Sequence, residues 1–133
     1  HCVTRRQRQM CIRDSSANDQ IISLAMIETE QAVENAEAIC STPGLTGIYV
    51  GPSDLAISMG EGPGLDRGPG KVYDAIQHVL TTAKASGIRA GLHCMDPDYI
   101  KKMYECGFDF ASLSNDVRLL TQVVTSQINA VRS

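Results

Sequence analysis

Two apolar runs, each followed by a carboxylate, lie about one strand–helix–strand unit apart in this chain. The first run closes with residues 26–29, which include Glu28, and the second closes with residues 51–55, which include Asp54. A unit of this kind takes roughly 30 residues. Because consecutive strands of a parallel sheet are usually neighbours, both carboxylates are expected at the same edge of one sheet. That edge, at the carboxyl ends of the strands, is where parallel α/β folds bind ligands.

Two carboxylates at a strand edge are suited to a hard divalent cation. Glu28 and Asp54 have no third protein ligand at motif spacing, so Mg²⁺ or Mn²⁺ would keep open positions for water and substrate. An alternative is that Asp54, which precedes a short apolar stretch, is only the N-cap of a helix.

The alternation of apolar runs and helical stripes predicts a parallel α/β fold with four βα units. Strands are expected at residues 21–27, 48–50, 88–92 and 108–113, and the nearly unbroken run at 21–27 is typical of a strand covered on both faces. Helices are expected after Thr29, over residues 72–83, after Asp96-Pro97 up to Gly107, and from Asp116. Crossovers between such strands are right-handed.

Residues 60–70 carry five glycines and two prolines, which predicts a loop between two of these units. A phosphate-binding loop is the alternative, but the Gly-x-Gly-x-x-Gly and Walker patterns are absent from it.

Charge and cysteine content exclude several classes of protein. The net charge is −3, and all 15 acidic residues follow Arg13, so the body of the chain is acidic and a poor binder of nucleic acid. Five cysteines without a Cys-x-x-Cys pair argue against a disulfide framework or structural zinc and favour the reducing cytoplasm. No apolar run approaches the roughly 18 residues of a membrane span, so no membrane partner is expected.

The first residues differ from the rest of the chain. Four arginines precede the first acid, and residues 1–15 resemble translated adapter or vector sequence more than a targeting segment, because they lack an amphipathic pattern. We therefore expect a disordered leader at residues 1–17 and a folded domain at residues 18–133.

The two acidic motifs resemble a known pair. Met26-Ile27-Glu28-Thr29 followed by Ala32, and then Gly51-Pro52-Ser53-Asp54-Leu55, are similar to the signature of the class II pyruvate aldolases in the HpcH/HpaI aldolase and citrate lyase family. The likeness runs from about residue 21 to residue 132. Because a complete (β/α)₈ TIM barrel needs about 250 residues, the resemblance implies the C-terminal half of such a barrel. It also implies a homo-oligomer in which the last helix, from Asp116 to Arg132, is exchanged between subunits.

The family's chemistry is the reversible cleavage of 4-hydroxy-2-oxo acids into pyruvate and an aldehyde. The resemblance implies that Glu28 and Asp54 hold the divalent cation, and that Gly51, Ser53 and Asp54 bind the substrate, with backbone N–H groups on its carboxylate. The lysines lie on or beside the expected helices, so a Schiff-base mechanism is not expected.

The chain departs from the family in two respects. Many members have glutamine where this chain has Met26, which leaves that substrate contact in question. The family's acid–base histidine and pyruvate-binding arginine lie in the first half of the barrel, so their roles transfer to no residue here.

Other residues near the expected strand ends have two interpretations each. His93 follows the third strand and is either a candidate for proton transfer or a loop histidine bonded to the backbone. Cys94 is expected to be an inert, packed thiol. Asn115, Asp116 and Arg118 are expected first as helix-cap residues, with pocket contacts as the alternative.

Two other functions remain open at this point. A citrate lyase β-subunit or malyl-CoA lyase would share the fold and the metal but act on thioesters; the Gly51–Asp54 motif and the short length favour the aldolase. The second alternative is a half-barrel that has no activity of its own. In either case the 133 residues alone are expected to be inactive.

Overall fold

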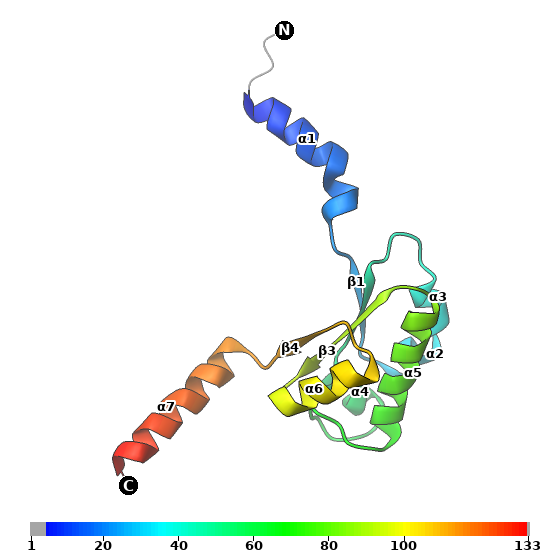
Figure 1. The fold of residues 1–133 in the computed structure, drawn as a ribbon. Coiled ribbons are helices and arrows are strands. Elements are labelled where there is room, and N and C mark those ends of the chain that lie inside the picture. The colour runs from blue at the N-terminus through cyan, green and yellow to red at the C-terminus, as the bar shows by residue number, and fades with distance from the viewer. Residues whose placement is uncertain (1–4, 133) are drawn as a thin grey trace.

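The computed structural model describes residues 5–132, and a four-stranded parallel sheet lies at its centre (Figure 1). Each strand is hydrogen-bonded to the next one along the chain, in the order β1-β2-β3-β4. The strands are β1 (Leu24–Ile27), β2 (Gly47–Val50), β3 (Arg89–Cys94) and β4 (Phe110–Leu113). The predicted parallel α/β fold and its strand order are therefore confirmed.

Helices follow every strand, as the sequence pattern predicted. They are α2 (Glu30–Glu34) and α3 (Ala36–Cys40) after β1, α4 (Pro52–Ser58) and α5 (Lys71–Ala85) after β2, α6 (Pro97–Cys106) after β3, and α7 (Asp116–Arg132) after β4. The predicted caps at Thr29 and Asp96 each accept hydrogen bonds from backbone N–H groups of the following turn. Gly107 ends α6 at a φ of 112°, a conformation that glycine adopts without strain.

The core lies on one face of the sheet. Alternate residues such as Ile48, Val50 and Leu92 point to this face and are completely buried, against the apolar stripe of α5. That stripe is the predicted one: Val72, Ala75, Ile76, Val79, Leu80 and Ala83 are all buried. Each fully buried aliphatic side chain contributes about 1.5–3 kcal/mol, so this face supplies most of the hydrophobic stabilisation.

The opposite face of the sheet is open, which contradicts one prediction. The run at residues 21–27 was expected to form a strand covered on both faces, but β1 is an edge strand in which Met26 is 54% exposed. The other residues that alternate onto the open face include Tyr49, His93 and Phe110. The apolar run is therefore only half covered, because residues 5–132 place no layer over this second face.

Aromatic packing holds the middle of the open face. The rings of Tyr49 and Phe110 stack with centroids 6.0 Å apart and planes inclined by 14°. Gly91 is paired with both residues in the sheet, and a Cβ on Gly91 would overlap the Phe110 ring. The stack therefore requires glycine at this position.

Asp109 joins α5, β3 and the start of β4. Its carboxylate accepts hydrogen bonds from Lys84 Nζ at 2.5 Å, from Arg89 Nη1 at 2.9 Å and from the backbone N–H of Ala90 at 2.9 Å. Burial disfavours the charged carboxylate, but these hydrogen bonds outweigh it and lower the pKa of Asp109 to about 2.

A helix at the N-terminus departs from the predicted disordered leader. The chain is helical in α1 (Arg5–Gln20), which projects away from the body formed by the sheet and helices α2–α6 (Figure 1). Residues 1–4 of the expected leader lie outside the described residues. The boundary of the packed domain after residue 17 stays a prediction.

The last helix, α7, also projects away from the body (Figure 1), and none of its residues is buried. Its start at Asp116 is as predicted, but the cap is Asn115 and not Asp116: Asn115 Oδ1 accepts a hydrogen bond from the backbone N–H of Arg118 at 2.9 Å. Asp116 is the first helical residue. Within residues 5–132, no helix combines the length and apolar character needed to cross a membrane.

Candidate active site

The residues predicted from the two motifs meet at the carboxyl ends of β1 and β2. Glu28 directly follows β1, and Asp54 lies in the first turn of α4, which follows β2. The two strands are adjacent and parallel, as the spacing predicted. Together with β3 they border a cavity of about 160 Å³, which is lined by Met26, Glu28, Tyr49, Gly51, Pro52, Ser53, Asp54, Leu65 and His93.

Both carboxylates converge on the open space beside Gly51. The position that a Cβ would occupy on Gly51 is 3.4 Å from Glu28 Oε2 and 3.9 Å from Asp54 Oδ2. It is also 3.3 Å from Glu28 Cβ, so any larger residue at position 51 would press against the glutamate. The backbone N–H of Gly51 donates to the carbonyl oxygen of Ile27 at 3.0 Å, which extends the β1–β2 pairing into the site.

This arrangement fits a hard divalent cation. Two carboxylate oxygens border a space that the missing side chain of Gly51 leaves free, and oxygen is the ligand that Mg²⁺ and Mn²⁺ prefer. Among residues 5–132, no group of three or more acidic, histidine or cysteine side chains gathers in metal-binding geometry. A cation held by Glu28 and Asp54 would therefore complete its coordination with water and substrate.

The alternative interpretation of Asp54 as a helix N-cap is wrong. Gly51 is the N-cap of α4, and Pro52 and Ser53 precede Asp54 within the helix. An acidic residue in the first turn is nevertheless favourable, because the helix dipole carries partial positive charge there. The carboxylate of Asp54 thus stabilises the first turn without being its cap, and Asp54 is exposed.

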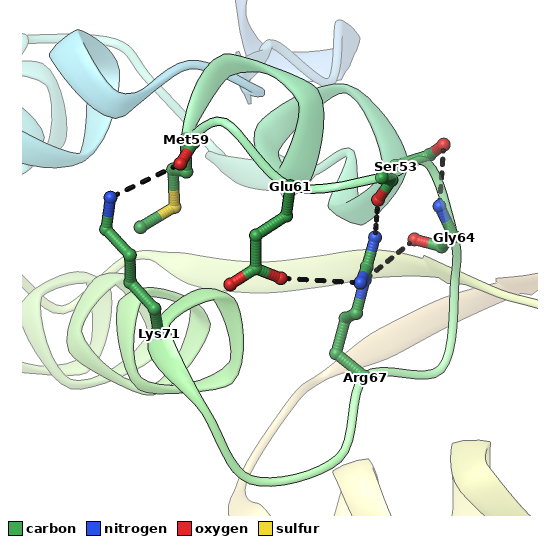
Figure 2. Close-up of polar contacts among 7 residues, drawn as sticks. Ser53, Met59, Glu61, Gly64, Arg67 and Lys71 are labelled. Atoms are coloured by element: carbon green, nitrogen blue, oxygen red, sulfur yellow. Dashed lines mark hydrogen bonds and ion pairs between the residues drawn. The ribbon is translucent and has the colours of Figure 1, made fainter.

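Ser53, predicted to bind substrate, has a structural contact. Its hydroxyl oxygen accepts a hydrogen bond from the backbone N–H of Gly64 at 3.2 Å, in the loop of residues 60–70 (Figure 2). Arg67 donates to the carbonyl oxygens of Gly64, at 3.1 Å from Nε, and of Gly62, and it pairs with Glu61 at 3.6 Å. The predicted loop is therefore an ordered wall attached to the start of α4.

The far end of the loop is attached to the next βα unit. Asp66 Oδ1 accepts from the backbone N–H of Met95 at 2.9 Å, and the hydroxyl of Tyr99 donates to the carbonyl oxygen of Arg67 at 2.9 Å. Leu65 lies between Gly64, which is bonded to Ser53, and Asp66, which is bonded to Met95, and these contacts place it at the cavity. Nothing in the glycine- and proline-rich sequence of the loop singles out Leu65 as a pocket residue.

His93 lies inside β3 and not in a loop after it, so the alternative of a loop histidine bonded to the backbone is wrong. Its Nδ1 atom is 2.6 Å from Ser112 Oγ and 3.3 Å from the hydroxyl of Tyr49, and its side chain lines the cavity. Tyr49 and Ser112 were missed as site residues. The sequence could have indicated Tyr49, because a residue between the apolar Ile48 and Val50 of a strand points to the opposite face from both.

Cys94 is an inert thiol, as predicted. It is completely buried beside His93. Burial, with a smaller effect from the negative charge of Asp66, raises the pKa of the Cys94 thiol to about 12. At neutral pH the sulfur is therefore protonated and not nucleophilic.

The fold and the site define a parallel α/β protein with an acidic pair at the carboxyl edge of its sheet. The chain belongs to the HpcH/HpaI aldolase/citrate lyase family, whose sequence profile matches residues 2–122. The match begins well before residue 21, where the resemblance was expected to start, and it includes most of the expected leader.

Two relatives agree with this family, and a third agrees in fold. It is 34% identical over 119 residues to the hydroxypyruvate/pyruvate aldolase of Rhizorhabdus wittichii, a match that covers 90% of this chain and 47% of that protein. A crystal structure of a family member from Burkholderia cenocepacia superposes with a TM-score of 0.84 at 30% identity, covering 100% of this chain and 52% of the other.

The third is a citrate lyase β subunit from Mycobacterium tuberculosis, solved in complex with oxaloacetate and magnesium. It is 21% identical and superposes with a TM-score of 0.54, and the match covers 71% of this chain and 48% of the other. This similarity supports the fold alone. The chain thus spans about half the length of the relatives that it matches.

Proposed function

We propose that the chain carries the metal-binding part of a class II pyruvate aldolase, which cleaves 4-hydroxy-2-oxo acids into pyruvate and an aldehyde. The observation that carries the proposal is the convergence of Glu28 and Asp54 on the space beside Gly51. The similarity to a hydroxypyruvate/pyruvate aldolase favours this branch of the family over the thioester lyases.

The residues of this chain have distinct tasks in that reaction. Glu28 and Asp54 hold Mg²⁺ or Mn²⁺, which supplies Lewis-acid stabilisation of negative charge on a 2-oxo acid. Gly51 keeps the space beside the carboxylates open, and the backbone N–H groups of Ser53 and Asp54 bind the substrate carboxylate. The hydroxyl of Ser53 positions the loop of residues 60–70, and Leu65 on that loop forms an apolar side of the pocket.

We further propose that the four βα units are the C-terminal half of a (β/α)₈ barrel. The open face of the sheet supports this, because the exposed Met26 and the Tyr49–Phe110 stack lie where the interior of a closed barrel would be. The similarity to half of the B. cenocepacia chain agrees with it.

The metal assignment is tested by titrating the 133-residue chain with Mn²⁺ and following free Mn²⁺ by electron paramagnetic resonance. We expect one site, and we expect Glu28→Gln and Asp54→Asn each to weaken binding at least about tenfold, equivalent to ~1.4 kcal/mol. Glu105→Gln, an exposed acid on α6, is the matched control and should bind as the unchanged chain does. Equal binding by all four proteins would refute the assignment.

We also propose that α7 docks on a second copy of the chain, as an exchanged helix in a homo-oligomer. The apolar residues Val117, Leu120 and Val124 share one helix face and are 46–69% exposed within their own chain. A face of this kind is usually covered by a partner.

Sedimentation analysis tests the α7 proposal. We expect the unchanged chain to sediment as a dimer or larger species, and the double variant Leu120→Glu/Val124→Glu to sediment as a monomer. Gln122→Glu/Ser126→Glu adds the same charge on the opposite side of the helix and should leave the assembly intact. A monomeric unchanged chain, or an unaffected Leu120/Val124 variant, would contradict the proposal.

A further inference from the structure

Three polar side chains on the open face of the sheet form a closed triangle. Tyr49 comes from β2, His93 from β3 and Ser112 from β4. Ser112 Oγ lies 2.6 Å from His93 Nδ1, the Tyr49 hydroxyl lies 3.3 Å from the same nitrogen, and the two hydroxyls are hydrogen-bonded to each other. Because His93 and Ser112 are register partners, the sheet itself holds two corners of the triangle.

The third corner is held by packing. The ring of Tyr49 stacks on Phe110, whose own ring lies over Gly91. This fixes the direction of the Tyr49 ring. Its hydroxyl therefore reaches His93 and Ser112, which lie two residues further along β3 and β4 than Gly91 and Phe110. The triangle is therefore supported from all three strands and does not depend on a flexible loop.

The protons of the triangle have two possible arrangements when the imidazole is neutral. If Nδ1 is unprotonated, Tyr49 donates to Ser112 and Ser112 donates to Nδ1, so each hydroxyl proton has an acceptor. If Nδ1 carries the proton, it donates to one hydroxyl and that hydroxyl donates to the other, whose proton then has no acceptor within the triangle. Both arrangements contain two hydrogen bonds, and they differ in the place of the third proton. In the first arrangement that proton lies on Nε2, the ring nitrogen outside the triangle, and His93 lines the same cavity as the Glu28 and Asp54 carboxylates. Nearby carboxylates favour an N–H group over a nitrogen lone pair, so the cavity favours the first arrangement.

We propose that Tyr49 and Ser112 hold neutral His93 in the Nε2–H form, so that the histidine presents an N–H donor to the cavity that also contains Glu28 and Asp54. Both hydrogen bonds that His93 makes within the described part of the chain use Nδ1, which leaves Nε2 for a ligand. A neutral N–H donor binds a carbonyl or hydroxyl oxygen.

The position of His93 indicates which oxygen it binds. His93 lies on β3, beyond Asp54, whereas Glu28 lies on the other side of the cavity after β1. If the acidic pair binds the 2-oxo acid end of a substrate, His93 takes the oxygen of the aldehyde half. This assignment of the ligand rests on the proposed function; the imidazole form does not.

Nitrogen-15 NMR of the uniformly labelled 133-residue chain tests the imidazole form directly. The spectra are recorded in a buffer alkaline enough for both rings to be neutral. We then expect His93 to show a protonated Nε2, and an Nδ1 resonance displaced from that of a free ring in the direction of a hydrogen-bond acceptor. His78, an exposed histidine on α5, is the internal reference for an unconstrained ring. His93→Gln assigns the signals by removing them.

Two variants test the source of the effect. Ser112→Ala should return the Nδ1 resonance of His93 to the position of His78, and Tyr49→Phe should shift it part of the way. Tyr104→Phe, which removes the hydroxyl of an exposed tyrosine on α6, should change nothing. A protonated Nδ1, or a Nδ1 resonance that Ser112→Ala leaves in place, would overturn the proposal.

Titration with glycolaldehyde tests the ligand. We expect the Nε2 proton resonance of His93 to shift on addition and the shift to be lost in Ser112→Ala but retained in Glu28→Gln. Absence of any His93 shift would overturn the aldehyde assignment. Because Glu28→Gln is judged separately by Mn²⁺ binding, failure of the metal site is distinguishable from failure of the His93 donor.

Discussion

The 133-residue chain by itself is expected to release pyruvate from a 4-hydroxy-2-oxo acid at least about 10²–10⁴-fold more slowly than a complete relative does. Loss of a positioned acid–base group alone costs this much. If the chain is the C-terminal half of a barrel, as proposed above, the acid–base histidine and pyruvate-binding arginine implied by the family resemblance belong to the other half. The open face of the sheet also leaves the pocket in contact with water, which weakens electrostatic stabilisation of developing charge.

Pyruvate release is followed with Mg²⁺ or Mn²⁺ present and then with a chelator, and the R. wittichii aldolase serves as the complete reference. Adding the N-terminal half of that relative to the chain is expected to raise turnover, because it would cover the open face and supply the missing groups. Robust chelator-sensitive turnover by the chain alone would contradict the half-barrel proposal. Turnover that survives the chelator would contradict the metal assignment at Glu28 and Asp54.

Replacing Gly47 by alanine is expected to destabilise the fold by about 1–3 kcal/mol, the usual cost of overpacking. Gly47 is buried in β2 and paired with Arg89 of β3. A Cβ on Gly47 would overlap the carbonyl oxygen of Arg89 and lie 3.0 Å from its carbonyl carbon. These are backbone atoms of a central strand, so relief requires the β2–β3 pairing to shift, whereas a clash with a side-chain tip is relieved by rotation.

Urea denaturation followed by far-UV circular dichroism measures the change. Gly68→Ala is the matched control, because a Cβ on Gly68 would meet nothing within 4 Å. We expect that variant to lie within about 0.5 kcal/mol of the unchanged chain. A Gly47→Ala protein as stable as the Gly68→Ala protein would show that the strand pairing adapts at no cost.

The sequence by itself determined the parallel order of the strands, the helix caps at Thr29 and Asp96 and the meeting of Glu28 with Asp54. All of these depend on local patterns. Apolar periodicity reports secondary structure, cap residues bond to their own turn, and the spacing of one βα unit brings successive strand ends to one edge.

Only the tertiary structure decided how the pocket is built around that pair. Leu65 reaches the cavity because Ser53 and Met95 hold its loop through hydrogen bonds to residues distant in sequence. The Tyr49–His93–Ser112 triangle likewise depends on register between three strands. A one-residue slip in register would turn these side chains to the other face, and no local pattern specifies register across separate strands.

The exposure of β1 is a further property that local sequence did not determine. Residues 21–27 are apolar enough for a strand covered on both sides, yet Met26 is largely exposed in this chain. An apolar run records that a strand is suited to burial, whereas the layer that buries it is made of other segments. Whether such a layer is present is decided by the whole tertiary or quaternary structure.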